Sequence, residues 1–254
     1  MALYAETLGD GPSIVLVHGW GFDSGVWHEW AKDLARRFRV TRIDLPGYGG
    51  SRDVASDFSA ATLAEQVLAQ CEPPVIWVGW SLGGMIGLAA AGAGHPAIVG
   101  LGLIGATAKF SQDDDWQHGM QTEQLNQFMR ELEEDARATL SRFASLQPGA
   151  GDGRRLLRRL RRALPTEVPT MQALRAGLQL LSQADLRAQV ASIDIPVALV
   201  HGSDDQIVPI GAAQHLMAQL PRATLVAIEG GGHAPFLSHP LDCTAAVVAT
   251  QTAL

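Results

Sequence analysis

The sequence is poor in cysteine and in charged residues. Cys71 and Cys243 are its only two cysteines in 254 residues, and they stand far apart, without the spacing of a metal site. We therefore expect two unpaired thiols in a reducing compartment rather than a secreted domain held by disulfides. Charged residues make up 18% of the chain and hydrophobic residues 47%, which argues against global disorder and allows a sizeable core.

Targeting features and long apolar runs are also lacking. The first residues have neither the basic start nor the apolar segment of a secretory signal peptide. The longest weakly polar runs, residues 82–94 and 97–108, are too short and too rich in glycine to span a bilayer. A net charge of -7 argues against a general nucleic-acid binder. We expect a cytoplasmic monomer with neither a nucleic acid nor a membrane as partner.

What the chain does contain is a rhythm of short apolar runs separated by segments of helical length. The runs cover residues 14–17, 38–43, 75–78, 98–104, 195–200 and 224–228. Continuous apolar strands that alternate with helices are typical of a mostly parallel sheet with helices on both faces. The sequence therefore predicts an α/β fold.

Residues 111–186 break this rhythm because they show helical patterns and no strand. Their first part is rich in acidic residues and their second part in arginine. We predict a helical cap at 111–186, inserted into a core formed by residues 1–110 and 187–254. In open α/β folds ligands bind beyond the carboxyl ends of the strands, so such a cap would cover the active site.

The stretch Gly79-Trp80-Ser81-Leu82-Gly83 carries the strongest chemical signal. It has the pattern G-x-S-x-G, it follows an apolar run, and it precedes a helical segment. This context predicts a nucleophile elbow, a sharp turn that holds a serine in strained backbone geometry and needs glycine beside it. Ser81 is the candidate nucleophile, at a helix N-terminus that favours negative charge.

A serine hydroxyl needs a base, and the base needs a group that orients it. His233 follows three glycines after the last apolar run and is the candidate base. Asp204 and Asp205 follow the preceding run, and either one could be the acid or could cap the next helix. The order serine, aspartate, histidine is the order found in α/β hydrolases.

The first apolar run supplies candidate electrophilic groups. It ends in His18-Gly19-Trp20-Gly21, where the backbone N–H of Trp20 could meet an oxyanion. The N–H of Leu82, directly after the serine, would be the second donor. Each donor of this kind commonly contributes ~3 kcal/mol to transition-state stabilisation.

The arginine-rich stretch has an amphipathic pattern. Leucines at 156, 157, 160 and 164 fall on one helical face and arginines on the other. A dense positive cluster on a negatively charged protein predicts the steering of an anionic partner. A glycine-rich stretch, residues 148–153, precedes the cluster and predicts a flexible link.

Together these motifs resemble the pimeloyl-[acyl-carrier protein] methyl ester carboxylesterases of biotin synthesis, over nearly the whole chain. Beside the elbow, the matching stretches are Leu16–Gly21, Asp44–Gly49, Arg142–Gln147 and His233–Pro240. The resemblance implies Ser81 as nucleophile, Asp205 rather than Asp204 as acid, and His233 as base. It implies that the substrate channel is lined by Trp20, Leu82, Phe143, Ala144, Ser145, Leu146 and Gln147.

The resemblance also implies the partner, an acyl-carrier protein that bears the substrate. The cap arginines would dock this acidic carrier: Arg142, Arg154, Arg155, Arg158 and Arg159. No metal and no organic cofactor is implied. The expected reaction is hydrolysis of the methyl ester of the pimeloyl group on the carrier. Two alternatives stay open, a carrier-independent short-chain esterase or lactonase on the same scaffold and a non-catalytic binding module with this fold.

Overall fold

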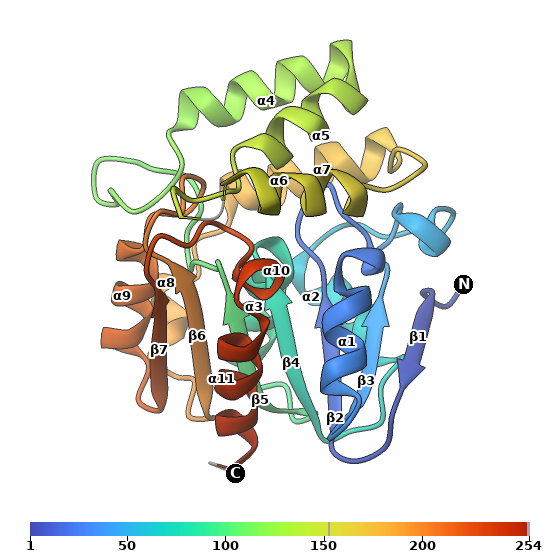
Figure 1. Ribbon diagram of the computed structural model, residues 1–254, viewed down its shortest axis with the longest axis vertical. Coiled ribbons are helices and arrows are strands. Elements are labelled where there is room, and N and C mark those ends of the chain that lie inside the picture. The colour runs from blue at the N-terminus through green and yellow to red at the C-terminus, as the bar shows by residue number, and fades with distance from the viewer. Residues whose placement is uncertain (152, 253–254) are drawn as a thin grey trace.

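The computed structural model describes residues 1–151 and 153–252, and it is built on a seven-stranded sheet (Figure 1). The strand order is β1-β3-β2-β4-β5-β6-β7. Only β1 runs antiparallel, to β3, and the other pairs are parallel. The strands are β1 Ala5–Leu8, β2 Ser13–Val17, β3 Arg39–Ile43, β4 Val75–Trp80, β5 Ile98–Ile104, β6 Val197–Gly202 and β7 Ala223–Ile228.

Both faces of the sheet are buried, which explains the continuous apolar runs of its strands. Successive side chains of a strand point to opposite faces. Ile14 and Leu16 of β2 accordingly pack in one hydrophobic cluster, and Val15 and Val17 pack in the other. Each cluster is closed by helices, so the sheet forms the middle of three layers.

The residues of the two clusters show which helices cover each face of the sheet. The face of Ile14 is covered by α1 (His28–Leu34) and α11 (Pro240–Thr252). The opposite face is covered by α2 (Ala60–Leu68), α3 (Leu82–Gly92), α8 (Arg187–Val190) and α9 (Gly211–Gln219). Three short helices lie in loops: η1 (Ser24–Trp27), η2 (Gly49–Ser51) and α10 (Pro235–Ser238).

The six apolar runs all form strands, so the predicted α/β fold is confirmed. The antiparallel edge strand β1 was not predicted. Its sequence, AETL, is short, and three of its four residues are half-buried, so it carries little apolar signal. Within the described residues, no helix has the length and the apolar composition that crossing a bilayer requires.

Four helices between β5 and β6 form a further layer across one end of the sheet (Figure 1). We call them the helical layer: α4 (Thr122–Glu134), α5 (Ala136–Ser145), α6 (Gly153–Ala163) and α7 (Met171–Gln183). The layer is fastened to core loops. The backbone N–H of Thr170 donates to the carbonyl of Gly47 over 2.9 Å, and the indole N–H of Trp20 donates to the carbonyl of Leu174 over 2.9 Å.

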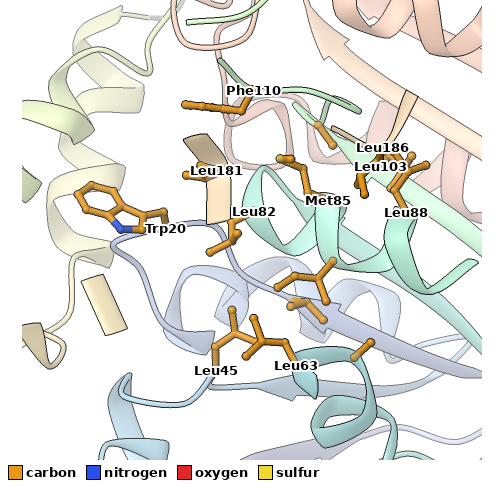
Figure 2. Packing of buried hydrophobic residues seen from close by; sticks show 14 of the residues in the cluster. Trp20, Leu45, Leu63, Leu82, Met85, Leu88, Leu103, Phe110, Leu181 and Leu186 are labelled. Carbon is orange, nitrogen blue, oxygen red and sulfur yellow. The ribbon is translucent and has the colours of Figure 1, made fainter. Parts of the chain in front are cut away.

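Apolar side chains continue from the core into the helical layer. Figure 2 shows Trp20, Leu82, Met85, Phe110 and Leu181, which belong to the same buried cluster although they come from the core, α3, α7 and the chain after β5. The layer therefore shares its hydrophobic packing with the sheet and its helices, and it covers the ends of β2 and β4 where the candidate site residues lie.

Candidate active site

Ser81 occupies a strained turn between β4 and α3. Its backbone has φ 53° and ψ -115°, a conformation that costs a non-glycine residue about 1–3 kcal/mol. A Cβ atom on Gly79 would overlap the carbonyl group of Gly83, and a Cβ on Gly83 would overlap the carbonyl oxygen of Val17. The turn thus needs glycine on both sides of the serine for steric reasons, as the sequence pattern indicates.

The carboxylate of Asp205 and the imidazole of His233 form a buried hydrogen-bonded pair. His233 Nδ1 lies 2.7 Å from Asp205 Oδ2, and both side chains are fully buried. Because a carboxylate can only accept, Nδ1 carries the proton and the lone pair of Nε2 is free to act as a base. Asp204 instead accepts a hydrogen bond from the backbone N–H of Ala150 over 3.2 Å. The geometry therefore favours Asp205 over its neighbour.

Several groups keep the Asp205 carboxylate ionised. Burial alone raises the pKa of Asp205, but the adjacent imidazoles of His233 and His201 and their hydrogen bonds outweigh burial and hold the pKa well below its usual range. His201 Nε2 lies 3.3 Å from Oδ2. The other oxygen, Oδ1, accepts from the backbone N–H groups of Ile207 and Val208 over 2.8 and 2.9 Å. The carboxylate is thus fixed in place by hydrogen bonds to both oxygens.

Ser81 and His233 both lie against the end of β5. The N–H of Ser81 donates to the carbonyl of Ile104 over 2.9 Å, and a Cβ on the next residue, Gly105, would lie 3.0 Å from His233 Nδ1. Ser81 Oγ and His233 Nε2 are both buried, and neither has a hydrogen-bond partner among the described residues. Two buried polar atoms without a partner among the described residues suit a nucleophile and a base whose hydrogen bond tightens on a bound substrate.

Two backbone N–H groups border the serine. A Cβ on Gly19 would lie 3.3 Å from Ser81 Cβ, so the loop that carries the N–H of Trp20 passes close to the serine. The N–H of Leu82 begins α3 directly after it. Neither group donates a hydrogen bond within residues 1–151 and 153–252. Free donors at this position can stabilise an oxyanion.

The loop that carries Trp20 is fixed by His18, a buried residue that the sequence analysis did not assign. His18 Nδ1 donates to the carbonyl of Gly19 over 2.9 Å, and Nε2 accepts the N–H of Leu45 over 3.0 Å. Burial lowers the pKa of His18, which keeps the ring neutral, as this pair of bonds requires. His18 thereby ties the Trp20 loop to the neighbouring loop after β3.

The expected channel residues at 143–147 differ in their burial and in their contacts. The ring of Phe143 meets Trp20 edge to face at 5.0 Å, and Ala144 is fully buried. Leu146 is half-buried against the core. The side chain of Gln147 is buried, and both of its polar atoms lack a partner among the described residues. Ser145, in contrast, is exposed and donates to Ser141 of its own helix, so it does not face the triad.

The expected docking arginines are divided in the same way. Arg154, Arg155 and Arg159 of α6 line a hollow of about 650 Å³ together with Ser238 and Glu229. We call this site the α6 hollow. The guanidinium of Arg159 also donates to the carbonyl of Leu237, and Arg158 is exposed on the same helix.

Arg142 is used within the helical layer. It forms an ion pair with Glu131, and its guanidinium lies over the ring of Phe128 at 4.7 Å. It is not among the residues that line the α6 hollow. The structure therefore brings Arg154, Arg155 and Arg159 together and leaves Arg142 apart from them.

Neither a metal site nor a reactive thiol is found among the described residues. Within the described residues, no group of three or more histidine, cysteine or acidic side chains is placed to hold a metal ion. Burial raises the pKa of the Cys71 thiol to about 12, and it raises the pKa of Cys243 as well. Both thiols are thus protonated at neutral pH and are poor nucleophiles.

Two further supporting residues were missed from the sequence. His201 bonds to Asp205, as described above, and the indole N–H of Trp80 donates to the carbonyl of His233 over 2.8 Å. Both stand inside stretches that the motifs single out, at the end of β6 and next to Ser81. Their position in those stretches is the only signal that could have found them. Trp80 and His233 are 153 residues apart, and the four-residue spacing of His201 and Asp205 does not by itself indicate a contact.

A strained serine after a central parallel strand, a buried imidazole–carboxylate pair on later loops and two N–H groups without a partner among the described residues are the features expected of a carboxylic ester hydrolase. The chain belongs to the alpha/beta hydrolase family, whose sequence model matches residues 14–246. Among its relatives is a pimeloyl-[acyl-carrier protein] methyl ester esterase of Nitrosomonas europaea, 41% identical over 241 residues that cover 94% of this chain and 95% of that protein.

Further relatives agree with this result. A protein of Stenotrophomonas maltophilia with the same description is 38% identical over 247 residues, which cover 96% of this chain and 95% of that protein. An esterase from Exiguobacterium antarcticum has the same fold, with a TM-score of 0.87 and 24% identity, covering 97% of this chain and 94% of that one. The resemblance drawn from the motifs is confirmed, and so is the prediction of a carboxylic ester hydrolase.

Proposed function

We propose that this protein hydrolyses the methyl ester of pimeloyl-acyl-carrier protein in biotin synthesis, releasing methanol and pimeloyl-carrier protein. The relatives described as pimeloyl-[acyl-carrier protein] methyl ester esterases match this chain over nearly their full length. The observation that carries the proposal is the buried Asp205–His233 pair beside the strained Ser81. This arrangement supports ester hydrolysis through an acyl-enzyme.

In the first half of the reaction, Ser81 Oγ attacks the ester carbonyl and His233 Nε2 takes its proton. The tetrahedral intermediate places its oxyanion at the N–H groups of Trp20 and Leu82, each worth about 3 kcal/mol of transition-state stabilisation. Asp205 keeps Nδ1 protonated and stabilises the imidazolium that forms. The imidazolium then protonates the departing methoxide, which leaves as methanol.

In the second half, water attacks the acyl-enzyme. His233 Nε2 takes a proton from the water and returns it to Ser81 Oγ when the acyl group leaves as the free carboxylic acid. Every proton transfer of this cycle passes through one imidazole nitrogen. The near-complete burial of Ser81, which is 3% exposed, favours the reaction because the charges that develop there are screened little by water.

We assign the choice of substrate to residues 111–186, acting as a cap on the core of residues 1–110 and 187–254. Phe143 and the unpaired amide of Gln147 would border the acyl chain, beside Trp20 and Leu82. The α6 hollow and its exposed neighbour Arg158 would dock the acidic carrier, because they present a local positive charge on a chain of net charge -7.

The test compares three substrates in two proteins. The wild-type protein should release a burst of product from an activated ester and cleave methyl pimeloyl-carrier protein, and Ser81→Ala should lose both activities. Equal kcat/KM for the carrier-bound ester and for free methyl pimelate would instead identify a carrier-independent esterase or lactonase. A Ser81→Ala protein that keeps the burst would disprove the assigned nucleophile.

A further inference from the structure

Residues 147–151, which join α5 to the beginning of α6, lie against both loops of the acid–base pair. The backbone N–H of His233 donates to the carbonyl of Gln147 over 2.7 Å. The N–H of Gly151 donates to the carbonyl of Gly230 over 3.1 Å. On the other loop, Asp204 accepts from the N–H of Ala150 over 3.2 Å. We call residues 147–151 the clamp.

Glycines allow this contact because the backbones touch directly. A Cβ on Gly149 would overlap the carbonyl oxygen of Gly230, and a Cβ on Gly232 would overlap the carbonyl oxygen of Gln147. Gly149 is buried, although the stretch that contains it is rich in glycine and was predicted to be a flexible link. Gly149 packs against Gly230, whereas Ala150 and Gly151 are exposed, so the glycine at 149 serves contact rather than flexibility.

The two catalytic loops are also joined to each other next to the clamp. The N–H of Asp204 donates to the carbonyl of Gly231 over 2.9 Å, and the N–H of Gly230 donates to the hydroxyl of Ser203 over 2.8 Å. Three segments that are far apart in the sequence therefore form one hydrogen-bonded unit. Asp204 stands at its centre, next to the catalytic acid.

We propose that the clamp positions the catalytic base, with Asp204 and Gly149 as the positioning residues. The imidazole of His233 is held by Asp205 at one end, and its backbone is held by Gln147 at the other. A shift of the clamp would move the base relative to Ser81, and a misplacement of about 1 Å can cost ~100-fold in rate. This inference rests on the proposed function, because it assumes the roles of Ser81 and His233.

Three variants test the clamp on a small activated ester, which does not need the carrier. Asp204→Ala removes the acceptor of the Ala150 N–H and should lower kcat about 10-fold with KM within about twofold. Asp204→Asn keeps an oxygen that can accept from the Ala150 N–H, so its kcat should be close to that of the wild type. Gly149→Ala forces the backbones apart and should lower kcat about 100-fold.

Gly153→Ala is the matched control, since a Cβ on Gly153 meets nothing within 4 Å. It should leave kcat and the melting temperature unchanged. If Gly149→Ala does not fold, the two variants of Asp204 still test the proposal. A wild-type kcat in Asp204→Ala, or an Asp204→Asn protein that is as slow as Asp204→Ala, would overturn the proposal. Ser81→Ala distinguishes the clamp proposal from the proposed function, because activity that remains in this variant disproves the proposed function itself.

Discussion

The core and the helical layer meet at one site, but they hold their polar groups differently. In the core, Ser81, Asp205 and His233 are buried, and the charge of Asp205 is surrounded by hydrogen-bond donors. In the layer, α6 buries Leu156 and Leu160 and leaves most of its arginines exposed. Under the proposed function, the core carries the chemistry and the layer selects the substrate, so the two roles should be separable by mutation.

The largest effect is expected in the core, from Asp205→Asn. The amide has no charge to stabilise the imidazolium and can favour the wrong tautomer of His233, so kcat should fall about 10⁴-fold. The measurement is kcat on a small activated ester, together with a circular dichroism spectrum to show that the protein is folded.

Asp204→Asn is the matched control for this substitution. It makes the same chemical change one residue earlier, at a carboxylate that bonds to Ala150 and not to His233. It should keep most of the wild-type kcat. Two variants with similar losses would mean that the catalytic loop depends on both carboxylates and that the assignment of Asp205 alone is wrong.

The elbow of the core should also respond more strongly than the layer to an added methyl group. Gly83→Ala places a Cβ against the carbonyl oxygen of Val17, inside a buried turn that cannot expand. We expect a loss of about 2–4 kcal/mol in the free energy of unfolding, measured with urea. Gly153→Ala, in the open start of α6, should cost less than about 0.5 kcal/mol. Equal losses would show that the elbow has more room than the structure indicates.

In the layer, charge reversal should slow the hydrolysis of the carrier-bound substrate alone. The double variant Arg154→Glu and Arg155→Glu reverses two charges that line the α6 hollow. We expect kcat/KM for methyl pimeloyl-carrier protein to fall about 10-fold or more, with a weaker dependence on salt. The rate on a free short-chain ester should not change.

Arg161→Glu provides the matched control, since it reverses a charge on the same helix at a residue that does not line the hollow. Its effect on the carrier-bound substrate should be clearly smaller than that of the double variant. If both proteins lose activity equally, the carrier responds to the overall charge of α6 and not to the hollow.

The sequence predicted the parts of this molecule that depend on local constraints. The buried strands follow from continuous apolar runs, and the elbow follows from glycines that steric contact requires around Ser81. The candidate base His233 follows from its glycine-rich flank after the last strand. In each case a physical demand within a few residues leaves a pattern within the same few residues.

The remaining features depend on contacts between distant segments. Asp204 and Asp205 are chemically identical, and only the folded loops show which carboxylate meets the imidazole. Arg142 pairs with Glu131 across two helices, which no charge count indicates. Likewise, the glycine at 149 has the composition of a linker, and the structure shows that it packs against Gly230.

The smallest expected effect comes from an exposed counterpart of Asp205. Asp185, at the end of the helical layer, pairs with Arg187 over 2.6 Å, and the hydrogen bond from Arg187 lowers the pKa of Asp185 to about 2. A lowered pKa means that the pair stabilises the fold above the unfolded pKa of about 4 and that this contribution is lost as the pH falls toward 2. The side chain of Asp185 is 39% exposed, so water screens the pair.

Asp185→Asn should therefore lower the free energy of unfolding by less than about 1 kcal/mol at pH 7, and the difference from wild type should shrink between pH 4 and pH 3. Urea unfolding at these pH values measures it, with activity on a small ester as the control that should not change. A loss as large as that from a buried charge would place Asp185 with Asp205 and would contradict the distinction between a buried core site and a solvent-exposed layer.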